Sequence, residues 1–164
     1  MACVCNLADV DAECGRNAPG LKTIIDLACV GDITSIGAAT GHAVSTITPV
    51  TDMGFYMINI LRKDNDLKTT PNEDGGYNTE IKGFVSKQAA AKAAIFTTLA
   101  TDENYIALPR DQNGLRHIVG AVDHPAKVRV EAVTVPKNGY NVTITWEGHA
   151  DLPLIFTGSV PRPA

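Results

Sequence analysis

The segment Tyr140–Glu147 alternates between apolar and polar residues, and this constrains the fold more than any other stretch of the chain. A period of two places successive side chains on opposite faces of a β-strand. One face of this strand therefore covers a core and the other meets water or a partner. The apolar set is Tyr140, Val142, Ile144 and Trp146, and the polar set is Asn141, Thr143, Thr145 and Glu147.

Turn signals flank further strands in the same half of the chain. Asp111-Gln-Asn-Gly114 separates Tyr105–Leu108 from Leu115–Val119, and Asn-Gly supplies the positive φ angles of a tight hairpin. The turn signal Pro136-Lys-Asn-Gly139 follows Lys127–Val135, in which the apolar phase shifts by one residue after Ala132. Such a shift predicts a β-bulge. The C-terminal half is therefore expected to form an antiparallel sheet.

Short β-branched runs predict strands in the N-terminal half as well. They cover Thr23–Val30, Ile33–Ile36 and Ser45–Pro49; a helix over Leu21–Val30 is the alternative for the first. Phe55–Leu61 is apolar at almost every position, which is typical of a strand buried on both faces.

The polar segment Arg62–Gly76 separates this strand from the next one, Tyr77–Val85. A polar excursion of ~15 residues within a compact domain is uncommon and usually functional or disordered. We therefore expect a long protruding loop between two strands, with little contribution to the core.

The period changes from two to that of a helix after Ser86. Ala89, Ala93, Phe96 and Ala100 recur at helical spacing, and the Ser86 hydroxyl is a suitable N-cap acceptor. The sequence predicts one alanine-rich helix that lies close against a sheet.

Together these segments predict a mainly β protein with one α-helix (α+β). We expect an antiparallel β-sandwich or half-barrel flanked by the helix, with a long inter-strand loop and an N-terminal arm. The chain has 164 residues, of which 45% are apolar and 20% charged, enough for one domain with a core. Residues 1–20 are interpreted as the arm and 21–164 as the single domain.

Charge and hydropathy limit the possible partners. The net charge is −4, and the Lys and Arg residues are scattered along the chain, which disfavours tight nucleic-acid binding. A mildly acidic surface suits a conduit along which a polyanion slides without adhering. No apolar run reaches the ~20 residues that cross a bilayer, and the N-terminus lacks the pattern of a secretory signal. We expect assembly in a cytosol, without membrane contact.

The search for site chemistry yields little. Cys3, Cys5 and Cys14 lack the paired spacing of a structural zinc site and are better explained as buried thiols or as part of an arm that contacts a neighbour. None of His42, His117, His124 and His149 belongs to a catalytic motif, and the polar loop departs from the calcium-loop pattern. We therefore expect no enzymatic activity, cofactor or metal, and for Trp146 we favour core packing.

The order of elements resembles that of bacteriophage tail-tube proteins and the inner tubes of contractile injection systems. The segments that carry the resemblance are Gly76–Phe84, the helix after Ser86, Asp111–Gly120 and Gly139–Ile144, within a match that covers roughly 55–156. The resemblance implies sheets that join sideways into hexameric rings, which stack into a virion tail tube assembled in the host cytoplasm. Double-stranded DNA passes non-specifically through such a tube, and other tail proteins are further partners.

The resemblance also implies which residues make contacts between copies. The long loop reaches the adjacent ring, through Arg62, Lys63, Asp64, Asn65, Asp66, Leu67, Lys68, Glu73 and Asp74. The arm that holds Cys3, Cys5 and Cys14 ties neighbouring subunits together. An open sheet edge exposes unpaired backbone groups, and ring closure removes such edges.

Two other interpretations stay open. One is another virion part built on a similar sheet: a tail terminator, a neck ring or a decoration protein. The other is a small ligand-binding or carbohydrate-binding β-sandwich, in which Trp146, Tyr105 and Tyr140 are the stacking residues.

Overall fold

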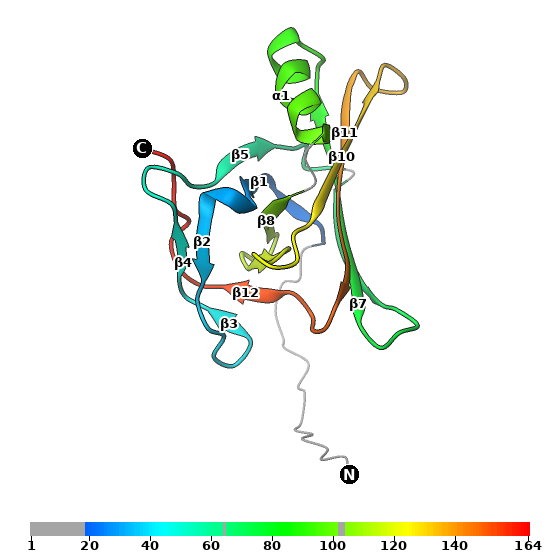
Figure 1. Ribbon diagram of the computed structural model, residues 1–164. Coiled ribbons are helices and arrows are strands. Elements are labelled where there is room, and N and C mark those ends of the chain that lie inside the picture. Colours follow the sequence, from blue (N-terminus) through cyan, green and yellow to red (C-terminus); the bar gives the residue numbers. More distant parts are fainter. Residues whose placement is uncertain (1–18, 64, 102–103) are drawn as a thin grey trace.

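The computed structural model describes residues 19–63, 65–101 and 104–164. Within them the chain is mainly β, with one α-helix, α1 (Ala90–Thr101). This confirms the predicted fold class of antiparallel sheets flanked by a helix. Figure 1 shows the strands wrapped around a common interior, with α1 at one end.

The larger sheet has six strands in the order β3-β12-β9-β8-β1-β5. Neighbours are antiparallel, except that β12 runs parallel to β3. The strands are β1 (Leu21–Cys29), β3 (Ala43–Val44), β5 (Tyr56–Asn59), β8 (Tyr105–Asp111), β9 (Arg116–Ile118) and β12 (Leu154–Phe156).

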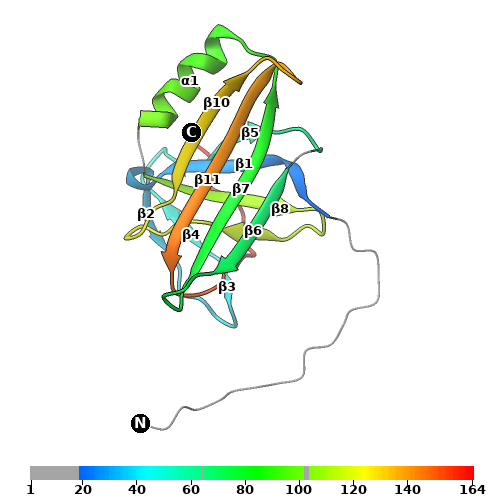
Figure 2. The same cartoon turned by 90° about the vertical axis from the view of Figure 1, so that its right-hand side faces the viewer.

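The second sheet has four antiparallel strands in the order β10-β11-β7-β6. Figure 2 shows it face on, with β10 and β6 as its two edge strands (margin strands) and α1 lying beyond β10. The strands are β6 (Asp66–Pro71), β7 (Tyr77–Ser86), β10 (Lys127–Val133) and β11 (Gly139–His149).

Two apolar clusters pack against opposite faces of the six-stranded sheet, because neighbouring residues of a strand point to opposite sides. Ile25 and Leu27 of β1 join the cluster shared with the four-stranded sheet and α1. Ala28 joins the second cluster. There the cover includes Ile33 and Ile47 of the small β2–β4 sheet, formed by β2 (Ile33–Ile36) and β4 (Ile47–Pro49) after the short 3-10 helix η1 (Val30–Asp32).

The alternating segment Tyr140–Glu147 lies in β11 as predicted. Val142 and Ile144 are buried, whereas Asn141 and Glu147 are exposed. The Asn-Gly hairpin is also present: Gly114 has φ 95°, and the turn connects β8 to β9. Both features are fixed by local patterns, which explains why the sequence predicts them.

The expectation of a long loop at Arg62–Gly76 is wrong, because β6 occupies Asp66–Pro71 within it. β6 pairs along its whole length with β7, from Asp66 opposite Lys82 to Pro71 opposite Tyr77. The polar composition of the segment predicted a loop because β6 is a margin strand with one polar face. Only its inward residues, Leu67 and Thr69, are half-buried.

Two further strand predictions need correction. β5 is exposed, with Tyr56 at 60% and Met57 at 57% of their full exposure, because it is the end strand of its sheet and has only β1 as a partner among the described strands. The predicted bulge near Val133 is absent: β10 pairs with β11 in unbroken register and ends at Val133. The phase shift therefore marks the end of the strand.

The helix begins later than predicted. Ser86 is not its N-cap, because it still belongs to β7 and pairs with Gly139 of β11. α1 starts at Ala90 and packs beside β10. Among the described side chains of its predicted stripe, only Phe96 is buried, against the Tyr140 ring at a centroid distance of 4.8 Å. Ala89 and Ala93 are exposed.

Within the described residues, no helix is long and apolar enough to cross a membrane.

Candidate assembly surfaces and a cavity beneath β6

The outer face of the four-stranded sheet is mostly polar, with Phe84 as an apolar exception on the same side as Lys82. No other helix or strand covers this face in Figure 2. Strand alternation sends Leu67, Ile81, Ile144 and Val128, which are register partners, toward the core. The flanking row runs from Asp66 through Lys82 and Thr143 to Arg129, all on the opposite side.

Charges on this outer face are balanced. The basic side chains, Lys68, Lys82, Lys127 and Arg129, are equal in number to the acidic ones, Asp66, Glu80, Glu131 and Glu147. Lys82 and Glu80 form an exposed ion pair at 2.9 Å. Its hydrogen bond and charge interaction raise the pKa of Lys82. The face therefore carries many charges but no strong field of one sign.

The margin strand β6 directs backbone groups out of the sheet. The Asn72 N–H donates to the Gly76 carbonyl at 2.9 Å, where the β6–β7 hairpin turns. Hydrogen-bonded and non-hydrogen-bonded pairs alternate along an antiparallel ladder, so Leu67, Thr69 and Pro71 direct their backbone groups away from β7. Proline at such a position loses no ladder bond. β6 thus has the geometry to pair with another strand.

The opposite margin of the sheet is β10, whose only partner strand among the described residues is β11. Gln88, just before α1, donates from Nε2 to the Val133 carbonyl at 3.0 Å. This bond ties the start of the helix region to the end of β10. The rest of β10 presents exposed Lys127, Arg129 and Glu131 at the margin.

A second surface is formed by α1 and β5, and it is apolar. Ile95 of α1 is 61% exposed and, with Met57 of β5, borders a cleft of ≈ 300 Å³ between the two elements. Ala90, Ala91 and Ala94 are also exposed. Exposed apolar residues that gather on one surface are typical of contact regions, so this surface has the composition of one.

The residues predicted to contact an adjacent ring are distributed over three local structures. Arg62 and Lys63 are exposed before β6; Asp66, Leu67 and Lys68 lie in β6; and Glu73 and Asp74 form the exposed hairpin turn. Asn65 is used internally: its Oδ1 accepts from Leu21 N–H at 2.7 Å, and its Nδ2 donates to the Leu61 carbonyl at 2.8 Å. Asp64 lies outside the described residues. The contact of all these residues with another ring stays a prediction.

The predicted contact arm, with Cys3, Cys5 and Cys14, also lies outside the described residues. In the part of the chain that is described, no cluster of three or more His, Cys, Asp or Glu side chains has the arrangement to hold a metal ion.

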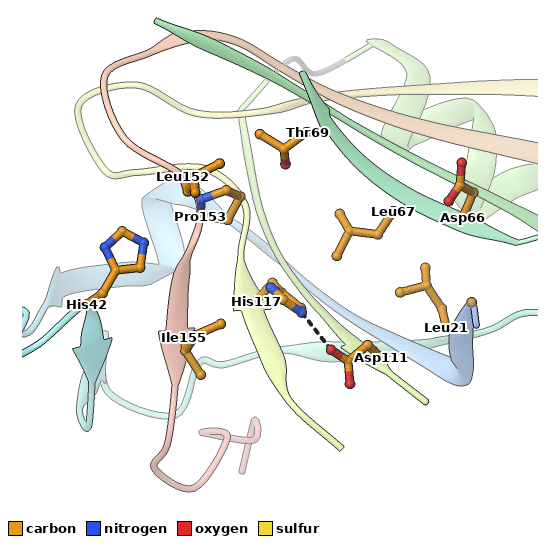
Figure 3. Close-up of a pocket in the computed structure, with 11 residues that line it drawn as sticks. Leu21, His42, Asp66, Leu67, Thr69, Asp111, His117, Leu152, Pro153 and Ile155 are labelled. Carbon is orange, nitrogen blue, oxygen red and sulfur yellow. Dashed lines mark hydrogen bonds and ion pairs between the residues drawn. The ribbon is translucent and has the colours of Figure 1, made fainter. Parts of the chain in front are cut away.

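A cavity of ≈ 470 Å³ lies between β6 and the six-stranded sheet. Figure 3 shows Leu67 and Thr69 of β6 on one side and His117 and Ile155 on the other, while the Asp66 carboxylate points away. Most of its lining is apolar, from Leu21, Leu67, Leu152, Pro153 and Ile155. Sequence reasoning missed this cavity because its walls come from segments far apart in the chain.

Asp111 and His117, which both line this cavity, form a hydrogen bond with Nε2 3.0 Å from Oδ2. Asp111 Oδ1 also accepts from the backbone N–H groups of Asn113 at 2.9 Å and Leu115 at 3.0 Å. Burial raises the pKa of Asp111, but the bonds from His117 and these amides outweigh it, so the pKa is lowered. Asp111 is therefore an ionised acceptor that closes its hairpin and orients His117.

The remaining ring cluster is packed rather than open. His149 is 4% exposed and stacks on Trp146 at 3.9 Å with an 8° interplanar angle. Trp146 Nε1 donates to the His124 carbonyl at 2.8 Å and its ring packs against the core, as predicted. Tyr105 and Tyr140, the other rings considered as ligand platforms, are buried.

Comparisons of this chain with protein-family models, with curated proteins and with solved structures found no match.

Proposed function

We propose that this chain is a structural subunit that assembles with copies of itself into closed rings, which stack into the tail tube of a bacteriophage. The observation that carries the proposal is the four-stranded sheet, which has a mostly polar outer face and two margin strands, β6 and β10, each with a single partner strand among the described residues. Joining β6 to β10 of the next copy would pair the outward backbone groups of β6 with those of β10, along the part of β10 that α1 does not flank.

The strand directions support this junction. The four strands alternate in direction, so β6 and β10 run opposite ways. Rotating a copy about a ring axis therefore brings its β10 antiparallel to β6 of its neighbour. A sheet with an odd number of strands would meet its copy in parallel instead. The contact is head-to-tail, the type that closes into rings.

The side chains at the two margins are also compatible. Asp66 and Arg129 are the two ends of one row of register partners across the outer face. If neighbouring copies join with these rows in line, the Asp66 carboxylate of one copy lies beside the Arg129 guanidinium of the next. Opposite charges across adjacent strands are favourable. The pair stabilises the register as well as the contact.

The outer face then lines the ring. Its balanced charges and its hydroxyl groups, from Thr70, Thr143 and Thr145, offer a double-stranded DNA no continuous basic track. Tight phosphate binding depends on such a track. DNA can therefore pass along this surface without being held.

A backbone change at Thr69 tests the proposal. Thr69→Pro removes the outward N–H that a neighbouring strand would use, and Thr69→Val is the matched control. Both variants lose the Thr69–Thr79 hydroxyl bond of 2.9 Å, but valine keeps the N–H. Sedimentation velocity should show assembly by wild type and by Thr69→Val, and monomers for Thr69→Pro. Equal assembly by both variants would rule out β6 as the junction.

The alternative of another ring-forming virion part makes the same use of the sheet margins. Electron microscopy of the assembled protein separates the two: stacked rings of one protein support a tube, whereas single rings support a terminator or neck component.

A further inference from the structure

The cavity beneath β6 has a chemical preference that is independent of assembly. Its walls are largely apolar, and its volume of ≈ 470 Å³ lies within the range of small-molecule sites, about 300–1,000 Å³. Its polar lining residues are His42, Asp66, Thr69, Asp111 and His117. His42 and Asp66 are exposed, so the groups considered for a ligand are Thr69 and the Asp111–His117 pair (Figure 3). Their hydrogen-bonding roles follow from their partners.

His117 presents an acceptor to the cavity. The ionised Asp111 carboxylate can only accept, so the His117 Nε2 at 3.0 Å must carry the hydrogen of that bond. In the neutral ring the other nitrogen, Nδ1, is then a lone-pair acceptor. Figure 3 shows this nitrogen on the side of the ring away from Asp111, toward Leu152 and Pro153.

Thr69 presents an acceptor as well. His149 Nδ1 lies 2.7 Å from the Asp151 carbonyl and must donate to it, so His149 Nε2 accepts from the Thr79 hydroxyl at 2.9 Å. The Thr79 oxygen in turn accepts the Thr69 hydroxyl hydrogen at 2.9 Å. The Thr69 proton is therefore committed, and only its lone pairs remain for a ligand.

We infer that this cavity binds a small apolar molecule that carries a hydroxyl group, of which phenol is the simplest probe. The apolar body replaces water against Leu21, Leu67 and Ile155, and the hydroxyl donates to His117 Nδ1. Asp111 already accepts three hydrogen bonds within the fold, so the group left for a ligand is the neutral His117 Nδ1, which needs a donor. A ligand that can only accept would leave the polar groups of the cavity unsatisfied.

Amide chemical shifts of the full chain, titrated with phenol and with anisole, test this inference. Anisole has the same ring and oxygen but no hydrogen to donate. Phenol should shift the amides of Leu67, His117 and Ile155 in a saturable manner, and anisole should bind roughly tenfold more weakly. Shifts that do not saturate, or equal affinities of the two compounds, would overturn the inference.

A pair of tryptophan variants locates the site. Leu152 is 50% exposed and borders the cavity, whereas Met53 is 41% exposed and does not. Leu152→Trp should fill the mouth and abolish phenol binding, and Met53→Trp should leave it unchanged. His117→Phe should remove the preference for phenol over anisole. Unchanged binding by Leu152→Trp would place phenol elsewhere. These measurements do not depend on rings forming, so they succeed or fail independently of the assembly proposal.

Discussion

Arg162 Nη1 donates to Asp26 Oδ1 at 2.6 Å, joining residues 136 positions apart in the chain. Asp26 lies in β1 and is 3% exposed. The same Arg162 nitrogen donates to the Phe55 carbonyl at 3.3 Å. The C-terminal segment is thereby fixed to the six-stranded sheet through a largely buried carboxylate.

Removing the arginine should leave Asp26 as an unpaired buried charge. Arg162→Ala is expected to lower the free energy of unfolding by about 3 kcal/mol, measured by urea denaturation. Lys63→Ala, an exposed cation, should change it by no more than about 0.5 kcal/mol. The double variant Asp26→Asn/Arg162→Ala should recover part of the loss, because an amide costs less to bury than a charge. Equal effects of the two single variants would contradict the role of the pair.

Folding stability should fall in mild acid because of His149. Burial lowers the pKa of His149 below its usual 6.5, an effect that exceeds the opposing bond to the Asp151 carbonyl. The unfolded chain therefore binds this proton at a higher pH than the folded chain. The contribution of neutral His149 to the free energy of unfolding is complete above about pH 6.5. It is lost as the pH falls through the lowered pKa of the folded state.

Unfolding free energies measured from pH 7.5 to 5 check this expectation. His149→Phe should show a shallower decline than wild type, since the titrating group is gone. His42→Gln, at an exposed position, should keep the wild-type slope. A wild-type slope in His149→Phe would mean that another group causes the acid sensitivity.

Gly139 marks a close approach of two strands. A Cβ at this position would meet the Val85 carbonyl oxygen and the Phe84 ring. Gly139→Ala should therefore destabilise the fold by roughly 2 kcal/mol through overpacking. Gly31→Ala, where nothing lies within 4 Å, should be close to neutral. Thermal unfolding of both variants distinguishes this steric effect from a general cost of losing glycine.

The apolar outer side of α1 should matter for association rather than for folding. Ile95→Ser changes a side chain that is 61% exposed, so stability should stay within about 0.5 kcal/mol of wild type. Phe96→Ala should instead cost about 3 kcal/mol, because it removes a buried ring that packs on Tyr140. If Ile95→Ser assembles at the same protein concentration as wild type, the α1–β5 surface is not a contact between copies.

The sequence predicted those features that depend only on neighbouring residues, such as strand alternation and tight turns. The strict alternation at Tyr140–Glu147 and the Asn-Gly turn at Gly114 required no knowledge of the rest of the chain. β6 could not be found in this way, because its polar residues become a strand only by pairing with β7. The apolar sequence of β5 predicts a buried strand, although β5 ends its sheet. The error arises because strand order is set by long-range pairing.

The candidate sites depended even more on tertiary structure. The Asp111–His117 pair is six residues apart in sequence, yet the cavity it faces is also bordered by Leu67 of β6 and by Leu152 in the bend before β12. Deleting Asp64–Asp74, which the loop interpretation treats as harmless to the core, would remove β6. We therefore expect that deletion to disrupt the four-stranded sheet.

We propose that the margins of the four-stranded sheet join copies of the chain, and cryo-electron microscopy of the assembled protein can show this junction. We expect a continuous antiparallel sheet around each ring, with β6 of one copy beside β10 of the next and the Lys82 face toward the channel. A ring in which β6 and β10 both face solvent, or a protein that stays monomeric at every concentration, would contradict it.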